Sequence, residues 1–293
     1  MLNWFGPTLM VTCSPTRLTV QRRTRFGHDC DAPVIYDLAS SRALQDAPRG
    51  RPTQGLTGLF DQFSSALTKL ELNGATIDIV LDDAWCRLFM TTPPSNPATL
   101  ADLTAAVALR FQILYGDSAS DWVLQNDQQA TMPFVCAAMP QAMHRGFIDI
   151  AKTSGSRITR LVPAYVDGWR RVRRLVGPGN WFAQIGDAQL TLAVFDKTHI
   201  RHLVQMPLDP LVRIALQPAW LIQLAQREAL RLNLPPPKRI VCAGSVSAAW
   251  TTADFAGQPC QVVTEQKRIS RGPKRGTAAT ASTEPIVSVG PSR

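Results

Sequence analysis

The chain has 293 residues, of which 45 % are apolar, enough to bury the core of one large domain or two modest ones. Its net charge of +9 first suggests a nucleic-acid or acidic-membrane partner. That charge is unevenly spread, because residues 1–52 carry a net +3, residues 53–263 carry +2 and residues 264–293 carry +4. The central body is therefore almost neutral, which argues against a basic nucleic-acid-binding core.

The sequence also excludes other classes of protein. It has no run of about 18 apolar residues, so no segment is predicted to span a membrane. The first residues lack the positively charged region of a signal peptide, and we expect a cytoplasmic protein. None of the six cysteines has the spacing of a zinc site or a dithiol redox site, so we predict no metal.

The N-terminal third of the chain is predicted to hold strands around one helix. Residues 1–16 mix apolar residues with proline and glycine, and we expect them to be poorly ordered. The patterns that follow predict, in order, a strand over 17–26, a helix over 56–72 and strands over 75–81 and 85–90.

The middle of the chain is predicted to alternate helices with strands. Apolar residues at helical spacing, with Gly116 as a stop, predict a helix over 100–115. The elements after it are a hairpin of 122–124 with 133–139, a helix over 141–152, a strand over 157–162 and a helix over 164–176.

The clearest hairpin joins residues 181–185 to 189–195 through the tight turn Gly186-Asp187. From about residue 264 almost no apolar residue remains, and we predict a disordered basic tail over 264–293. Between the hairpin and the tail we predict a strand over 200–206, a helix over 210–232 kinked at Pro218, and a strand over 238–243.

This order of elements predicts an α/β protein with an actin-like (ribonuclease H-like) fold of two halves. A three-stranded meander followed by a helix and a parallel strand is typical of one such half. We place a degenerate first half at 17–176, with an insertion near 98–138, and the second half at 177–263.

The segment 75–90, which reads ATIDIVLDDAWCRLFM, resembles the strand–turn–strand element of actin-like proteins in bacterial envelope assembly. These are the cytoplasmic platform components of type IV pili and type II secretion systems. The helix over 100–116, Pro163, Trp169 and the 181–195 hairpin follow in a matching order. The resemblance implies a position at the inner membrane and membrane-anchored pilus or secretion platform proteins as partners.

Actin-like ATPases hold phosphate with two hairpins that typically read Asp-x-Gly-x-x-x-Thr. In the second hairpin of this chain we match Gly186 and Thr191 to the motif, with Thr191 one position beyond the spacing above, but Gln184 stands at the aspartate position. Because glutamine is neutral, it is a weak partner for magnesium. The first motif is expected near 17–37, where nothing reads Asp-x-Gly.

The adenosine element of the family ends a strand with two glycines, and here that position reads Gly244-Ser245. If nucleotide is bound, the resemblance implies that Gly186, Thr191, Gly244 and Ser245 contact it. Without nucleotide, Gly186-Asp187 is simply a good hairpin turn and Gly244-Ser245 a loop at a strand end.

Two charged clusters have structural and functional interpretations. Asp82 and Asp83 would point apart on an extended chain, so we interpret them as turn or capping residues and not as a shared acid–base or metal site. Arg170, Arg173 and Arg174 would share a helix face, which could contact acidic lipid head groups or an acidic partner, or be merely solvated.

We therefore predict a non-catalytic actin-like scaffold with no cofactor. The alternative is an active ATPase of the same machinery that binds ATP with magnesium. A weaker alternative is a nucleic-acid-binding protein that acts through its basic ends, although we expect no specific nucleic acid.

Overall fold

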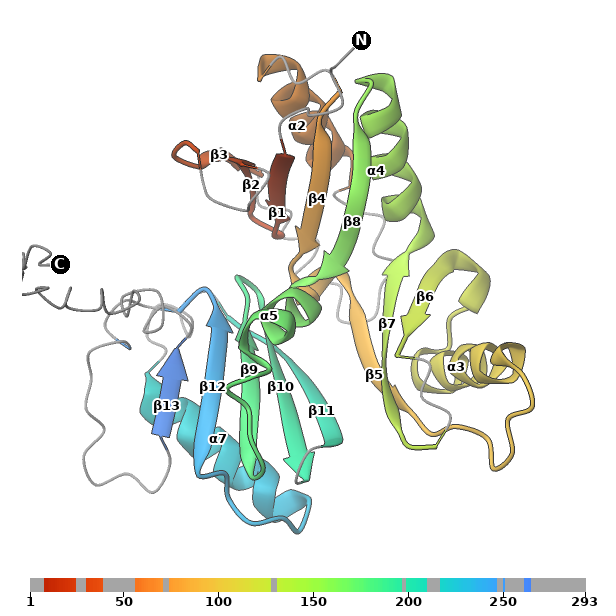
Figure 1. Ribbon diagram of the computed structural model, residues 1–293, viewed down its shortest axis with the longest axis vertical. Coiled ribbons are helices and arrows are strands. Elements are labelled where there is room, and N and C mark those ends of the chain that lie inside the picture. The colour runs from red at the N-terminus through yellow and green to blue at the C-terminus, as the bar shows by residue number, and fades with distance from the viewer. Residues whose placement is uncertain are drawn as a thin grey trace, which may run out of the picture.

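The computed structural model describes residues 8–24, 30–38, 56–70, 74–127, 131–196, 199–209, 217–246, 250 and 261–264. In these residues the strands form three sheets (Figure 1). Sheet 1 has the strand order β3-β2-β1-β4-β8, sheet 2 has the order β11-β10-β9-β12-β13, and a three-stranded insert sheet has the order β5-β7-β6.

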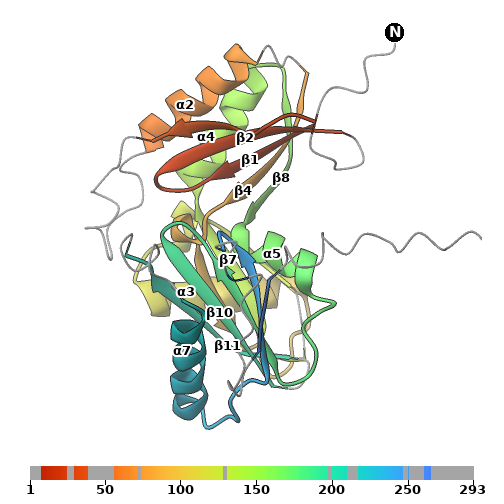
Figure 2. The same ribbon diagram turned by 90° about the vertical axis from the view of Figure 1, so that its left-hand side faces the viewer.

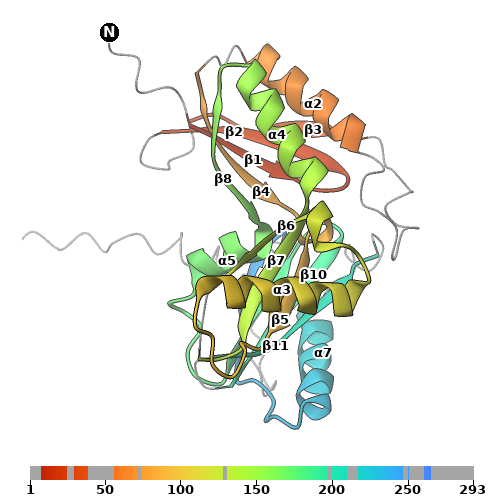
Figure 3. The ribbon, with the colours of Figure 1, turned by 90° about the vertical axis from the view of Figure 1, so that its right-hand side faces the viewer.

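Sheet 1 begins with an antiparallel meander of three strands, and its last two strands run parallel to β1. Two helices, α2 (Leu56–Lys69) and α4 (Gln141–Thr153), cover one of its faces (Figures 2 and 3). Every second residue of the central strands is buried beneath these helices, where Phe63 packs against Phe147. The strands are β1 (Thr8–Cys13), β2 (Arg17–Arg23), β3 (Val34–Asp37), β4 (Thr76–Leu81) and β8 (Arg157–Pro163).

Sheet 2 repeats this plan, with an antiparallel meander followed by two strands parallel to the first. Helix α7 (Pro218–Arg231) covers one face, and α5 (Ala164–Val172), which connects the two halves, packs on the other. The strands are β9 (Asn180–Ile185), β10 (Gln189–Asp196), β11 (His199–Pro207), β12 (Arg239–Gly244) and β13 (Gln261–Thr264).

The insert sheet lies between β4 and α4 in the chain. Its elements are the 3-10 turn η1 (Asp83–Trp85), β5 (Arg87–Thr91), α3 (Leu100–Tyr115), the 3-10 turn η2 (Ala119–Asp121), β6 (Trp122–Asn126) and β7 (Phe134–Pro140). One face packs on α3, while Leu88 and Val135 on the other join the core of sheet 2 beside Phe195. The inserted unit is larger than the predicted 98–138, because β5 pairs with β7 and not with sheet 1.

The prediction that residues 1–16 are poorly ordered is wrong for residues 8–13. These form β1, the central strand of sheet 1, with Leu9, Val11 and Cys13 fully buried. Apolar and polar residues alternate only weakly here because Met10 is also nearly buried, on the opposite face. The first half therefore begins before residue 17, and residues 1–7 lie outside the described part of the chain.

Two predicted helices have different bounds. Pro218 does not kink a helix but opens one, since α7 starts at this residue and the first helical position needs no N–H donor. Helix α5 ends at Val172 and not at residue 176, because the chain turns before Gly177-Pro178. Residues 210–216 and the predicted tail beyond Thr264 lie outside the described residues. In the part of the chain that is described, no helix is long and apolar enough to cross a membrane.

Candidate functional site: the cleft between the two halves

A cleft of about 280 Å³ lies where the first hairpin of each half approaches the other. The β1–β2 turn closes through a hydrogen bond from the Ser14 N–H to the Arg17 carbonyl at 2.9 Å. The β9–β10 turn closes in the same way, from the Gly186 N–H to the Gln189 carbonyl at 2.8 Å. The first turn thus lies at 14–17, upstream of most of the predicted 17–37 range, and serine stands there in place of the family's glycine.

Each hairpin's first strand also pairs with a parallel strand, which is β4 beside β1 and β12 beside β9. These two parallel strands end at equivalent places. The Asp82 N–H donates to the Cys13 carbonyl at 2.7 Å, and the Ser245 N–H donates to the Ile185 carbonyl at 2.8 Å. Just before Ser245, Gly244 has a φ of 96°, and a Cβ there would lie 2.1 Å from the Ile185 oxygen. Glycine is therefore required at 244 by both conformation and space.

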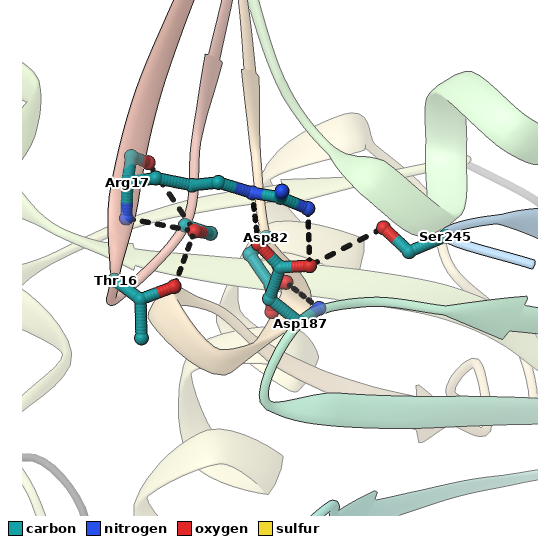
Figure 4. Close-up of polar contacts among 6 residues, drawn as sticks. Thr16, Arg17, Asp82, Asp187 and Ser245 are labelled. Atoms are coloured by element: carbon teal, nitrogen blue, oxygen red, sulfur yellow. Dashed lines mark hydrogen bonds and ion pairs between the residues drawn. The ribbon is translucent and has the colours of Figure 1, made fainter. Parts of the chain in front are cut away.

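An ion pair joins the two turns directly across the cleft (Figure 4). The Arg17 guanidinium donates two hydrogen bonds to the Asp187 carboxylate, each of 2.7 Å. This bidentate arrangement is the strongest geometry available to such a pair. The Ser245 hydroxyl adds a third, longer donor to Asp187 at 3.3 Å. The chain's own side chains therefore hold the two halves together at the cleft.

Asp82 lies beneath this ion pair, at the end of β4. Its carboxylate accepts the Ala84 N–H at 2.9 Å. It also accepts the Asp187 N–H at 2.7 Å (Figure 4). Burial raises the pKa of Asp82 to about 6, against the lowering effect of hydrogen bonds from the Ala84, Asp187 and Ala188 N–H groups. The predicted capping role is confirmed, because Asp82 caps η1.

Asp83 points away from Asp82, and its hydrogen bonds stabilise the junction between the two halves beneath the cleft. Its carboxylate accepts the Thr191 hydroxyl at 2.6 Å and the Tyr165 N–H at 2.8 Å, so it links β10 to the start of α5. Burial raises the pKa of Asp83 to about 7, while these two hydrogen bonds lower it. Thr191 is itself fully buried and lies beneath the cleft, not on its wall.

Gln184 lines the cleft at the position where the family has aspartate. Its side chain is 3 % exposed and fits into a slot between two glycines. A Cβ on Gly168 would lie 2.0 Å from the Gln184 Oε1, and a Cβ on Gly244 would lie 2.5 Å from its Nε2. The Oε1 has no hydrogen-bond partner among the described residues. Position 184 thus offers a neutral amide and no carboxylate.

Of the residues predicted to contact nucleotide, the structure brings Gly186, Gly244 and Ser245 to one cleft and places Thr191 in the core. The predicted interaction residues lie elsewhere on α5 and just past it. Arg170, Arg173 and Arg174 are exposed; Arg173 is the C-cap of α5 with αR backbone angles, and Arg174 follows it.

The residues that sequence reasoning missed are those that close the cleft. The sequence predicts only a strand at Arg17 and only a turn at Asp187. The sequence holds one weak indication of this pair. The β1–β2 turn carries a single basic residue, Arg17, and the β9–β10 turn, at the equivalent place in the second half, carries a single acidic residue, Asp187. That signal becomes readable only once β1 is recognised as the first strand of the repeat.

No protein-family model and no curated protein matches the sequence. A chain of the PilM–PilN type IV pilus biogenesis complex is 14 % identical, with a TM-score of 0.55 over 89 % of this chain and 91 % of that one. A Bacteroides thetaiotaomicron protein with an actin-like ATPase fold and unknown function is 10 % identical, with a TM-score of 0.54 over 90 % and 94 %.

A third solved structure is the cytoplasmic domain of EpsL, an inner-membrane component of the Vibrio cholerae type II secretion system. It is 12 % identical, with a TM-score of 0.48 over 81 % of this chain and 82 % of that one. The first two likenesses establish the fold. The chain has an actin-like fold, and the predicted α/β architecture of two halves is confirmed.

Proposed function

We propose that this chain is a non-catalytic actin-like scaffold in the assembly of a type IV pilus or type II secretion platform. It would act in the cytoplasm, peripheral at the inner membrane, and bind membrane-anchored platform proteins. The observation that carries the proposal is the cleft itself, which the chain's own Arg17–Asp187 pair bridges where an actin-like ATPase would hold phosphate.

The residues of the cleft fit magnesium–ATP poorly. Magnesium needs carboxylate or water oxygens, and position 184 supplies only an amide. The carboxylates that do line the cleft already have donors, since Asp187 is held by Arg17, and Asp167 accepts from Arg160 at 2.6 Å. A triphosphate would also meet the buried Asp82 carboxylate, whose negative charge repels it.

The fold likeness to a chain of the PilM–PilN complex supports the machinery, as does the resemblance of the 75–90 segment to actin-like platform proteins. An actin-like body without turnover would serve such a platform by presenting surfaces to several partners. We assign one of these surfaces to the exposed Arg170, Arg173 and Arg174, which suit an acidic partner segment or acidic lipid head groups.

Calorimetric titration of the full chain with ATP and magnesium separates the scaffold from an active ATPase. The scaffold predicts binding no tighter than the millimolar range and no phosphate release above buffer. Micromolar binding accompanied by hydrolysis would overturn the proposal, and titration with ATP in EDTA serves as the control for magnesium-dependent binding.

The surface is tested by co-flotation with a membrane-anchored platform protein reconstituted in phosphatidylcholine vesicles or in phosphatidylglycerol vesicles. Reversal of Arg170, Arg173 and Arg174 to glutamate should abolish flotation. A matched control reverses Arg157, Arg227 and Lys238, which are exposed in other parts of the chain. Equal loss in both triple variants contradicts a specific surface, whereas loss only with phosphatidylglycerol identifies lipid as the acidic partner.

A further inference from the structure

The Asp82 carboxylate lies against the tip of the β9–β10 turn. Its Oδ2 accepts the Asp187 N–H at 2.7 Å, and the neighbouring Ala188 N–H is close enough to lower the pKa of this carboxyl. Successive backbone N–H groups that converge on one point form a site for an anion. The turn therefore binds a negatively charged group, and that group belongs to the chain itself.

Gly186 supports the same conclusion independently. Its φ is not in the left-handed region, so its backbone conformation alone does not call for glycine. A Cβ at 186 would lie 2.5 Å from the Asp82 Oδ2, 2.9 Å from its Cγ and 3.0 Å from its Oδ1. Glycine is needed here because the whole carboxyl group packs over residue 186.

The surrounding charges fit a single resident anion. The Asp187 carboxylate is neutralised by Arg17, whose two donors are each 2.7 Å from it. Asp82 itself is 5 % exposed and reaches the turn from β4, on the opposite half of the molecule. Without the Asp82 carboxylate, the turn would present N–H groups with no anion on them.

We infer that the β9–β10 turn is an oxyanion site whose permanent occupant is the Asp82 carboxylate, which keeps phosphate out of the cleft. The site suits a small tetrahedral oxyanion such as inorganic phosphate, because a carboxylate and a phosphate present similar acceptor oxygens to N–H donors. This inference concerns the turn alone and goes beyond the scaffold role, which can fail while the inference holds.

Replacement of the carboxylate tests the inference by a gain of binding. The full-length Asp82→Ala variant is titrated with inorganic phosphate at pH 7.5 and constant ionic strength, and binding is followed by thermal unfolding and calorimetry. We expect phosphate affinity at least about tenfold above that of the unaltered chain, because a buried repulsive charge has gone and free N–H donors remain. Equal affinity in the two proteins would overturn the inference.

The matched control is Asp61→Ala, which removes the same charge from an exposed position on α2. An equal gain in this control would show a general charge effect and would also overturn the inference. ATP turnover by the unaltered chain, in contrast, would refute the scaffold proposal without touching the phosphate result for Asp82→Ala. The two failures are therefore distinguishable.

A second variant keeps the test decisive if Asp82→Ala does not fold. Gly186→Ala should lower the thermal midpoint, because the added methyl group displaces the carboxylate from the turn. Gly58→Ala on α2 is the control, since a Cβ there meets nothing within 4 Å and should not lower the midpoint. If Gly186→Ala is as harmless as the control, the carboxylate does not occupy the turn and the inference is wrong.

Discussion

The β1–β2 and β9–β10 turns have the same length and the same closing hydrogen bond, but they meet the cleft in opposite ways. The first turn contributes a side chain, because Arg17 reaches across to the other half. In the second turn, the Asp187 carboxylate accepts hydrogen bonds from Arg17, and the Asp187 N–H donates to Asp82. The two turns thus share a backbone closure, but the side chains that meet them across the cleft differ.

The threonines of the two hairpins differ in the same way. Thr19 and Thr191 stand at equivalent register positions, opposite Thr12 and Gln184. Thr19 lines the cleft, but Thr191 is fully buried and donates to Asp83. The cause is η1, which brings Asp83 against the second hairpin. A matching threonine therefore does not imply a matching role.

The largest expected effect comes from loss of the buried acceptor at this asymmetric junction. Asp83→Ala leaves the Thr191 hydroxyl and the Tyr165 N–H buried without an acceptor. We expect the free energy of unfolding to fall by about 3 kcal/mol, measured by urea denaturation. Asp121→Ala, at an exposed position, should change it little. A loss below about 1 kcal/mol would mean that water reaches this junction.

The next effect concerns the bridge between the turns. Arg17→Ala should cost about 1–2 kcal/mol, a value reduced by the 39 % exposure of the Arg17 side chain but supported by the 6 % exposure of Asp187. Asp187→Ala keeps the N–H that donates to Asp82, so a double-mutant cycle isolates the side-chain pair. A coupling energy near zero would show that the halves stay together without this pair.

The two buried carboxylates predict the direction of a pH effect. Burial raises the pKa of Asp82 to about 6 and that of Asp83 to about 7, above the ordinary value of 3.8. The folded state therefore binds more protons than the unfolded chain between about pH 4 and pH 7. This contribution to the free energy of unfolding is full below about pH 4 and is lost as the pH rises to about 7.

The doubly neutral variant Asp82→Asn/Asp83→Asn isolates that contribution. Its stability between pH 4 and pH 7 should fall less steeply than that of the unaltered chain, as followed by thermal unfolding at fixed ionic strength. Asp61→Asn, on the surface of α2, should leave the slope unchanged. Parallel pH profiles for the unaltered chain and the double variant would contradict the raised pKa values.

Much of the architecture could be predicted because each element carries its own pattern. The helix over 100–115 has a capping threonine and a glycine stop, and it forms with those bounds. The hairpin at Gly186-Asp187 was equally plain, since two alternating strands flank a tight turn. Strand β1 escaped prediction because its residues are buried on both faces apart from Thr8 and Thr12, so alternation is nearly absent.

The cleft could be predicted only in part, because its chemistry depends on long-range pairs. Gly186 and Gly244 were recognisable from their own local motifs, and both line the cleft. Arg17 and Asp187 are separated by 170 positions, and no local pattern relates them. The position of Asp82 depends on the parallel register of β4 with β1, which places it beside Cys13 and opposite the second turn.

The smallest expected effect tests the first turn by giving it the glycine of the second. The Ser14 Oγ accepts the Arg17 N–H at 3.1 Å and lies 3.2 Å from the Arg17 carbonyl, so this side chain stabilises its own turn. Ser14→Gly should therefore cost about 0.5–1 kcal/mol, through the lost hydrogen bond and the added backbone freedom. Thermal unfolding measures this change in stability. The control is Ser95→Gly at an exposed position, because Ser64 is helical and Ser64→Gly would itself destabilise α2. If Ser14→Gly stabilises the chain, the serine is not a structural part of the turn, and the two turns are less alike in their energetics than in their backbone.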